Sequence, residues 1–327
     1  NLRFKDVTTD AGLPGDVFGL GLTSADVNED GRPDLFVGHS NRFFLSTAAN
    51  KFIESPELAI TFAWLPLDGE DWPCGAAFGD LNRDGRLDMV LAIHGIRARN
   101  KVYLNDGLKG GVPQFRDITT AAGLPDEVPT RCPHVEVQDF DNDGWPDIYS
   151  SAAWLDKGEA GATKIAPLVF RNAGLTSGVP RFTAPRKIGD PMVYFPAGPS
   201  GDYDNDGRVD LLLVNWFADN HTRLLRNESP AKHNWLDVQV TGRTTNRMGI
   251  GAKVRLYQPG KSENPAALLG SQEIATGYGY ASGQAAIAHF GLASAPEVDV
   301  VVTLPNGKTI ENKNVKSNQQ LVVQEPE

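Results

Sequence analysis

The sequence predicts an all-β protein with two parts, a region of repeated β units followed by a smaller β unit. Two observations predict this architecture. An acidic nine-residue pattern occurs four times, 54 to 63 residues apart, and a short apolar run follows each copy. From about residue 234 the acidic pattern stops, although strand-like alternation continues. We therefore expect a repeat region at 1–230 and a β-sandwich-like unit at 231–327.

Composition and charge exclude several classes of protein. The chain has 327 residues, of which 40% are hydrophobic and 9% aromatic, so it can bury a sizeable core. It carries 31 Lys and Arg against 41 Asp and Glu, a net charge of −10. This balance argues against a nucleic acid partner, and no apolar run approaches the roughly 20 residues needed for membrane insertion. The chain begins at Asn1, so we expect a removed leader and an extracellular or periplasmic location.

The acidic pattern reads D-x-[DN]-x-D-G-x-x-D, and we name its copies loop 1 (26–34), loop 2 (80–88), loop 3 (139–147) and loop 4 (202–210). Ca²⁺ prefers six to eight oxygen ligands from a tight loop, and alternate side chains with a Gly at the bend supply them. The predicted ligands, with a backbone carbonyl at the seventh position, are Asp26, Asn28, Asp30, Arg32 and Asp34; Asp80, Asn82, Asp84, Arg86 and Asp88; Asp139, Asp141, Asp143, Trp145 and Asp147; and Asp202, Asp204, Asp206, Arg208 and Asp210.

The context of the loops predicts hairpins rather than helix pairs. An EF-hand needs Glu at its twelfth position, where these loops have Val37, Leu91, Ser150 and Leu213. We expect about four structural Ca²⁺ ions, bound more tightly by loops 3 and 4, which carry four carboxylates each. The alternative is an Asx-turn hairpin without an ion, which clustered carboxylates disfavour because they repel one another.

Other segments recur in phase with the loops. Third strands are predicted at 42–45, 101–104, 168–171 and 222–225, and fourth strands at 51–54, 114–118 and 181–183. Four strands per repeat are typical of a propeller blade. The last repeat lacks its fourth strand, while residues 4–14 closely match 115–125. We therefore predict a closed four-bladed β-propeller in which residues 3–8 complete the last sheet. An open array stays possible, as does a fifth blade if 55–72 or 184–197 contain strands.

The repeats resemble the FG-GAP/VCBS repeats of integrin α-subunit propellers and related bacterial proteins, over about residues 1–230. That resemblance implies calcium-stabilised β-propeller blades. The C-terminal unit resembles the ASPIC/UnbV domain through 234–236, 246–252, 277–280, 289–292, 305–307 and 318–319, with Leu304 where Trp is expected. Together the two parts resemble the cartilage-acidic-protein-like family, which implies an extracellular protein whose biochemical role is only loosely defined.

A second site is predicted on the propeller face opposite the loops, where ends of first and second strands collect aromatic and basic residues. Ligand-binding candidates are Trp72, Trp154, Tyr194 and Trp216, and catalytic candidates are His39, His94, His134, Arg97 and Arg99. Ordinary packing at strand ends is the alternative. Cys74 and Cys132 lie at matched positions before their loops, so a disulfide is possible in a secreted chain, as are two buried thiols.

These features predict a secreted, calcium-binding module that binds a glycan, peptide or matrix partner without turnover. The alternative is an enzyme, such as a lyase, isomerase or cyclase acting on a small molecule, that uses the histidines of the opposite face. A third reading is a structural part of a larger assembly. No nucleophile and base show a spacing that favours catalysis.

Overall fold

The computed structural model describes residues 2–47, 50–58, 72–94, 100–124, 132–153, 167–183, 186–188, 194–195, 198–215, 221–262 and 264–327. Within these residues the regular elements are strands, apart from two short 3₁₀ helices, η1 (Pro56–Leu58) and η2 (Pro265–Ala267). The predicted all-β class is thereby confirmed. Neither of these helices has the length and apolar character needed to cross a membrane.

The first two repeats each form a four-stranded antiparallel sheet whose strands follow in chain order. Each loop joins the first strand to the second, as the sequence predicts. Side chains alternate between buried and half-buried positions along β2, and every residue of β6 except the last is buried, so these central strands are covered on both faces. The strands are β1 (Leu22–Ala25), β2 (Asp34–Val37), β3 (Arg42–Thr47) and β4 (Lys51–Glu54), then β5 (Trp72–Gly79), β6 (Asp88–His94), β7 (Lys101–Lys109) and β8 (Val112–Asp117).

The third and fourth repeats are less regular. In the third, β15 pairs with β12 at the edge of the sheet β15-β12-β10-β9. β13 and β14 pair with each other in a separate two-stranded sheet. The fourth repeat is the three-stranded sheet β17-β18-β19. The strands are β9 (Val135–Gln138), β10 (Asp147–Ser150), β11 (Ala152–Ala153), β12 (Leu168–Phe170), β13 (Asn172–Thr176), β14 (Val179–Phe182), β15 (Arg186–Lys187), β16 (Tyr194–Phe195), β17 (Ser200–Gly201), β18 (Asp210–Leu213) and β19 (Arg223–Leu225).

Neighbouring repeats share a hydrophobic core at each junction. Phe43 of the first repeat packs in one cluster with Phe78 of the second. A second cluster joins the second repeat to the third, and a third one joins Tyr149 to Leu211 of the fourth. The repeats therefore pack face to face in chain order, as the blades of a propeller do, although the number of blades in a ring stays a prediction.

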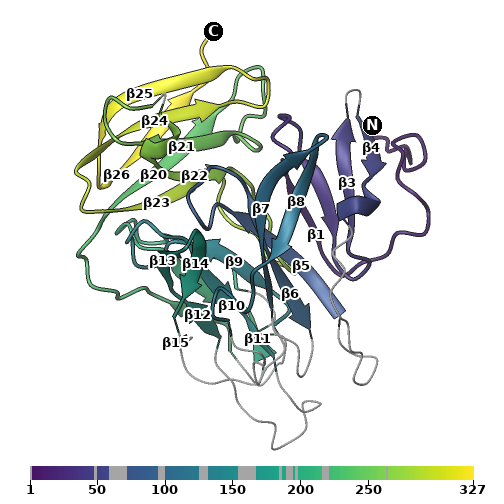
Figure 1. Ribbon diagram of the computed structural model, residues 1–327, viewed down its shortest axis with the longest axis horizontal. Coiled ribbons are helices and arrows are strands. Elements are labelled where there is room, and N and C mark those ends of the chain that lie inside the picture. The colour runs from purple at the N-terminus through teal and green to yellow at the C-terminus, as the bar shows by residue number, and fades with distance from the viewer. Residues whose placement is uncertain are drawn as a thin grey trace, which may run out of the picture.

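The C-terminal unit consists of two sheets, β23-β20-β26 and β22-β21-β24-β25, whose inner faces share one core. Strand β20 pairs in parallel with β26, and the other pairs are antiparallel. Figure 1 shows this green-to-yellow unit beside the repeats, above β13, β14 and β9. Its strands are β20 (Asn234–Thr241), β21 (Lys253–Tyr257), β22 (Leu268–Glu273), β23 (Ala288–Ala293), β24 (Glu297–Thr303), β25 (Thr309–Lys316) and β26 (Gln319–Gln324).

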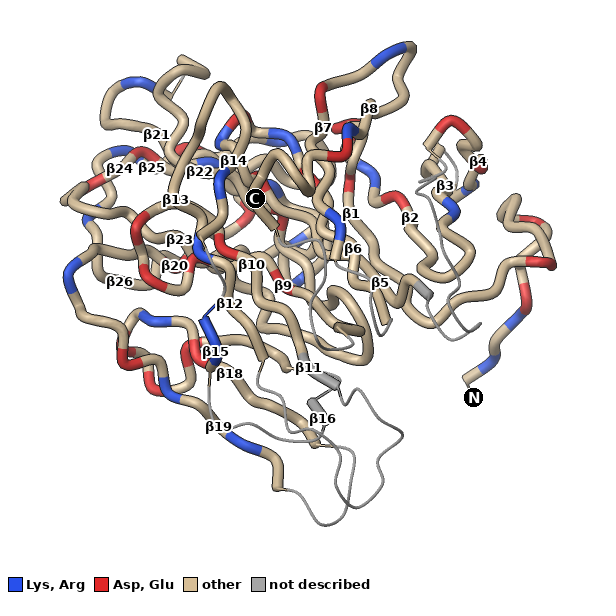
Figure 2. The backbone as a smooth tube through the Cα atoms, turned by 60° about the horizontal axis from the view of Figure 1, so that its bottom comes forward, with Lys and Arg blue, Asp and Glu red and all other residues tan. Residues whose placement is uncertain are grey.

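The N-terminal segment corrects one part of the prediction. Residues 3–8 form no strand, and the fourth repeat's sheet ends at β19 without a partner from the N-terminus. The segment lies instead beside the first repeat, where the Phe52 N–H of β4 donates to the Ala11 carbonyl at 2.7 Å. Figure 2 shows the N-terminus on the opposite side of the molecule from β18 and β19. A matching sequence is therefore not sufficient, because the strand needs an edge within reach.

The sequence also left room for a fifth blade. Two short strands lie in 184–197, but β15 joins the third repeat and β16 pairs with β11. Most of 55–72 lies outside the described residues, so this alternative is not tested there.

Candidate metal centres

The four loops share one backbone conformation. The fourth and sixth positions have positive φ in every loop, for example 58° at Glu29 and 83° at Gly31 in loop 1, and 57° at Asn142 and 88° at Gly144 in loop 3. This conformation turns the chain sharply enough to bring alternate side chains to one side. The sequence therefore encodes the same tight turn four times.

Two aspartates of each loop hold this turn by accepting backbone N–H groups. In loop 1 the Asp26 carboxylate accepts from the N–H of Asp30 and of Gly31, both at 2.9 Å. The last aspartate, Asp34, accepts from Val27 at 3.1 Å and from Ser46 at 2.7 Å. Loops 2 and 4 repeat all four bonds, and loop 3 repeats three of them. These carboxylates thus join the loop to the end of the third strand.

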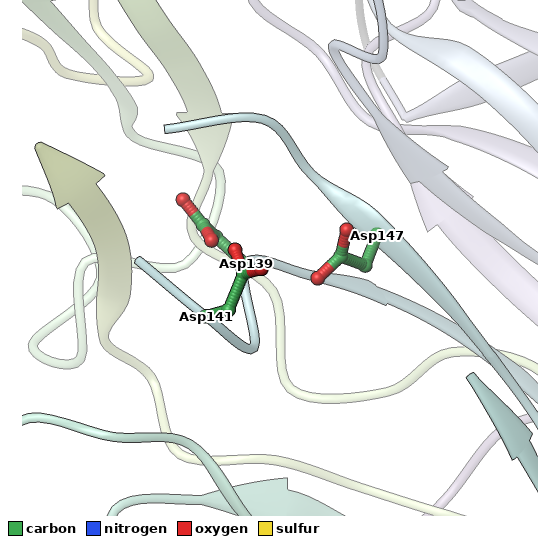
Figure 3. A group of neighbouring side chains, drawn as sticks. All are labelled: Asp139, Asp141 and Asp147. Atoms are coloured by element: carbon green, nitrogen blue, oxygen red, sulfur yellow. The ribbon is translucent and has the colours of Figure 1, made fainter. Parts of the chain in front are cut away.

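Loops 3 and 4 bring three carboxylates together. One oxygen each of Asp139, Asp141 and Asp147 lies within 4.8 Å of the others, and the equivalent residues of loop 4 are Asp202, Asp204 and Asp210. Figure 3 shows the loop 3 carboxylates gathered around the turn before β10. Loops 1 and 2 have Asn28 and Asn82 at the third position, so fewer charges converge there. Hard carboxylate oxygens at this spacing are a ligand set that suits Ca²⁺.

One oxygen in loop 3 has nothing to bond. Asp139 is 4% exposed, and its Oδ1 has no hydrogen-bond partner among the described residues. Burying a carboxylate oxygen without a partner is costly. A cation among Asp139, Asp141 and Asp147 would satisfy this atom, so the residues of loop 3 fit a bound ion.

The electrostatics of the loops also favour a cation. Burial raises the pKa of Asp34, Asp80 and Asp139 to about 7, and neighbouring loop carboxylates contribute to the shift. Burial raises the pKa of Asp88 and Asp147 well above the ordinary value of a carboxyl group. Each charged form is disfavoured by lost hydration and by repulsion between carboxylates. A bound divalent cation reverses both effects.

The fifth-position aspartates form ion pairs with arginines. Asp30 lies 2.6 Å from Arg32, and Asp84 and Asp206 pair in the same way with the arginine two residues later. Loop 3 has Trp145 at that place, and Arg171 instead pairs with both Asp141 and Asp143. Calcium coordination by the fifth-position carboxylates and the seventh-position carbonyls stays a prediction.

Each repeat from the second onward is joined to the loop before it by an asparagine. Asn172 donates its side-chain amide to the Leu81 carbonyl of loop 2 at 3.0 Å and to the Pro146 carbonyl of its own loop at 3.1 Å. Asn105 and Asn227 make the corresponding pairs of bonds. Sequence reasoning missed these residues, although an Asn recurs at the same place after three of the third strands.

The C-terminal unit covers the loops, which the sequence did not reveal. The Ala293 N–H donates to the Asn142 carbonyl of loop 3 at 2.9 Å, and His289 Nε2 lies 2.8 Å from Asn142 Oδ1. At loop 1, Glu273 Oε2 accepts the Asp26 N–H at 3.0 Å. A Cβ on Gly207 of loop 4 would overlap the Trp235 ring, so that contact is close. The loops therefore lie at the interface between the two parts of the chain.

The residues predicted on the opposite face are only partly described. His39 is exposed and its ring lies 5.0 Å from that of Phe18, while His94 ends β6 and is half-buried. The backbones of Trp72 and Tyr194 lie in β5 and β16. The side chains of Trp72 and Tyr194 lie outside the described part of the structure. The remaining candidates lie wholly outside the described residues, and they are Arg97, Arg99, Trp154 and Trp216.

His134 has a structural environment. It is 0% exposed, its Nε2 lies 3.0 Å from Glu136 Oε1, and its Nδ1 accepts the Tyr280 N–H at 3.2 Å. Because Nδ1 accepts, Nε2 carries the proton and donates to Glu136. Glu136 in turn accepts a hydrogen bond from Ser200. Both ring nitrogens are thus engaged: Nδ1 joins the third repeat to the C-terminal unit, and Nε2 bonds to Glu136 of the same repeat.

The cysteines are thiols in this structure. Cys74 and Cys132 are both buried and are not joined in the disulfide considered from the sequence. Burial raises the pKa of each thiol to about 12, which makes them poor nucleophiles. Their matched positions before loops 2 and 3 reflect core packing at equivalent places in two repeats.

Comparisons with known proteins agree with this description. A model of the FG-GAP-like repeat matches residues 26–91 and 80–150, and a model named ASPIC and UnbV matches residues 242–327. Cartilage acidic protein 1 of Mus musculus is 28% identical over 327 residues, and that of Homo sapiens is 28% identical over 336 residues. These alignments cover 94% and 97% of this chain but 45% of each relative.

A third relative gives the same result over a shorter stretch. Cartilage acidic protein 1 of Xenopus tropicalis is 29% identical over 241 residues, which is 72% of this chain and 34% of the relative. The chain thus spans less than half the length of the curated relatives it matches. FG-GAP-like repeats that form packed β-sheets are consistent with a β-propeller. The chain therefore contains FG-GAP-like repeats, followed by an ASPIC and UnbV domain, and it is similar over most of its length to cartilage acidic protein 1.

Proposed function

We propose that this chain is an extracellular, calcium-stabilised module that binds a matrix partner. The observation that carries the proposal is loop 3, where three converging carboxylates include a buried oxygen without a partner. Loop 4 offers a second group of the same kind. The similarity to cartilage acidic protein 1 supports a matrix or adhesion role and an extracellular location, since that name places the relative in cartilage.

The ion's effect follows from what the loop residues already bond. Asp147 accepts N–H groups from Phe140 within its loop and from Asn172 at the end of the third strand. The Asn172 amide then reaches the Leu81 carbonyl of loop 2. A cation that holds Asp147 in its charged form therefore stabilises the hairpin and the junction with the neighbouring repeat. Its role is structural, and the loop residues supply the ligands.

A groove between the third and fourth repeats supports a partner with negative charge. Its volume is about 530 Å³, and its lining combines apolar residues with four basic ones, Arg171, Arg186, Lys187 and Arg226. It also includes four acidic residues, Asp141, Asp147, Asp210 and Glu228, of which the three aspartates belong to the loops proposed to bind Ca²⁺. Arg171 and Arg226 already pair with loop carboxylates, whereas Arg186 and Lys187 are exposed. A sulfated or uronate-containing glycan matches this surface, because its anionic groups pair with cations while its ring faces pack on apolar side chains.

Calcium binding is tested by titration and thermal unfolding of the metal-free chain. We expect saturable binding by calorimetry, and about 2.7 kcal/mol of stabilisation per site when free Ca²⁺ exceeds its Kd a hundredfold. Asp139→Asn removes one ligand charge and should weaken binding at loop 3. Asp6→Asn, at an exposed aspartate outside the loops, should leave the titration unchanged. Identical melting curves in Ca²⁺ and in excess chelator would contradict the proposal.

Partner binding is tested with a panel of sulfated, carboxylated and neutral glycans in saturating Ca²⁺. We expect retention of anionic glycans that is lost in the double variant Arg186→Glu, Lys187→Glu, with no chemical change to the glycan. Equal retention by the double variant would exclude the groove. Turnover of a ligand would instead favour an enzyme.

A further inference from the structure

In one of the four loops, an aspartate already pairs with a lysine side chain from the C-terminal unit. Lys253 Nζ lies 2.8 Å from Asp26 Oδ2, at the first position of loop 1. The two side chains are 12% and 4% exposed, so the pair is largely shielded from water. Among the described residues, Asp26 is the one first-position aspartate of the four loops that forms an ion pair with a lysine or arginine.

The strand that carries Lys253 holds the ammonium group in place. Lys253 begins β21, between β22 and β24, and lies directly opposite Glu273. Glu273 Oε2 accepts the Asp26 N–H at 3.0 Å, so these cross-strand neighbours contact the side chain and the backbone of the same aspartate. Two residues along β21, Arg255 pairs with Glu29 of the same loop at 3.0 Å. Moving the ammonium away would require breaking this set of contacts.

Loop 3 provides the contrast. Its first-position residue Asp139 has an oxygen without a hydrogen-bond partner, and three carboxylates face one another there. Arg83 donates to the Gly144 carbonyl of loop 3 at 2.7 Å and lies over the Trp145 ring, and it forms no ion pair with Asp139. Arg171 pairs with Asp141 and Asp143 of loop 3, but among the described residues no lysine or arginine pairs with the first-position Asp139, whereas in loop 1 Lys253 pairs with the first-position Asp26.

The charges of loop 1 make a second cation unfavourable. Asn28 replaces one carboxylate, and Arg32 pairs with Asp30 at 2.6 Å. The Lys253 ammonium adds a positive charge at Asp26. A divalent ion coordinated by Asp26 would lie within a few ångströms of the ammonium in a poorly hydrated site, where like charges repel strongly.

We propose that Lys253 serves as the built-in cation of loop 1, so that this loop takes no Ca²⁺ while the C-terminal unit is docked. The proposal rests on the proposed calcium binding at the other loops. It lowers the expected number of bound ions by one. In loop 1 the Lys253 side chain of the ASPIC and UnbV domain, rather than a metal ion, then neutralises the charge of Asp26.

The test counts Ca²⁺ per chain after equilibrium dialysis of the full chain at saturating Ca²⁺, with atomic emission as the readout. We expect Lys253→Met to bind one ion more than the wild-type chain. Lys253→Arg, which keeps the charge, should match the wild type. Lys316→Met serves as the control, since Lys316 lies on the same unit but pairs with Glu297. Equal counts for the wild type and Lys253→Met would overturn the proposal.

A second measurement does not depend on the folding of the Lys253 variant. Asp26→Asn in the wild-type background should leave the ion count unchanged, because loop 1 contributes no ion. A count lowered by one would overturn the inference while supporting the proposed function. A wild-type chain without Ca²⁺ would contradict the proposed function, and a gain of one ion in Lys253→Met would still support the inference. No ion in either chain would overturn both.

Discussion

Two segments of this chain have almost the same sequence and different structures. The N-terminal segment (4–13) and the internal segment (115–124) differ at three positions. In the internal segment, Phe115 lies in β8 and its ring stacks on Phe43 at 5.8 Å, and Ile118 is 1% exposed. In the N-terminal segment, Phe4 is 96% and Val7 is 49% exposed.

The second halves of the segments nevertheless fold alike. Each forms the same turn, in which Ala11 donates to the Val7 carbonyl at 2.7 Å and Ala122 donates to the Ile118 carbonyl at 2.6 Å. Each turn also accepts one N–H from the fourth strand of the next repeat. The turn is therefore encoded locally, whereas the strand before it forms only where β7 offers an open edge. Strand formation depends on pairing more than on propensity.

The largest difference is expected for the residue that precedes the turn. Ile118→Ala should lower the free energy of unfolding by about 2–5 kcal/mol, because it leaves a cavity in the core between two repeats. Val7→Ala should change it by less than about 0.5 kcal/mol. Urea unfolding in saturating Ca²⁺ measures both. A large loss for Val7→Ala would show that the N-terminal strand pairs in solution, as the closed-ring prediction requires.

An intermediate effect is expected where the two segments are alike. Gly12 and Gly123 have φ of 84° and 87°, and an added Cβ would meet the carbonyl oxygen of Phe52 or Phe182. Gly123→Ala should cost about 1–2 kcal/mol of global stability. Gly12→Ala should instead loosen only its own segment, because few other contacts hold that segment.

Hydrogen exchange of the Phe52 and Phe182 amides, which bond to Ala11 and Ala122, tests this pair of glycines. Gly12→Ala should speed exchange at the Phe52 amide, which bonds to Ala11, without shifting the urea midpoint. Gly12→Ser serves as a second substitution with the same backbone penalty. A midpoint shifted equally by Gly12→Ala and Gly123→Ala would mean that both segments belong to one cooperative unit.

The smallest effect is expected for the aspartate of each segment. Burial alone raises the pKa of Asp117, but hydrogen bonds from Thr119 and the Lys101 ammonium lower it overall. Its stabilisation is therefore present above the unfolded pKa near 3.9 and is lost as the pH falls through the lower folded value. Asp117→Asn should cost at most about 1 kcal/mol at pH 7, since Asp117 is 40% exposed.

Asp6 occupies the same place in the N-terminal segment. The Thr8 backbone and side chain donate to it and lower its pKa, and Asp6 is fully exposed. We therefore expect no measurable change in stability for Asp6→Asn at pH 7. Unfolding curves between pH 3 and pH 7 compare the two variants. An acid transition that Asp117→Asn leaves unaltered would remove this difference between the segments.

Much of the architecture could be predicted because its determinants are close in the sequence. Each loop places its ligands within nine residues, so alternation and one glycine suffice to predict the turn and the convergence of Asp139, Asp141 and Asp147. The apolar runs after the loops predict the second strands for the same reason. The ASPIC/UnbV resemblance of the C-terminal motifs is likewise confirmed by the family model that matches residues 242–327.

The remaining features depend on contacts between distant parts of the chain. Glu273 accepts the Asp26 N–H although the two residues are 247 positions apart in the sequence, and no local sequence pattern predicts that pairing. The docking of the C-terminal unit on the loops could not be predicted for this reason. The same holds for the pairing of Lys253 with Asp26 of loop 1. The prediction that residues 3–8 complete the last sheet was wrong for a related reason. Their sequence suits a strand, but the edge at β19 lies in another part of the fold.

The asparagine that joins successive repeats has a consequence for how such chains can evolve. Because Asn172 bonds both to its own loop and to the preceding one, a duplicated repeat would carry one half of a junction at each end. A copy inserted between two existing repeats would find both complementary halves in place. Lengthening by duplication therefore requires no new interface between repeats.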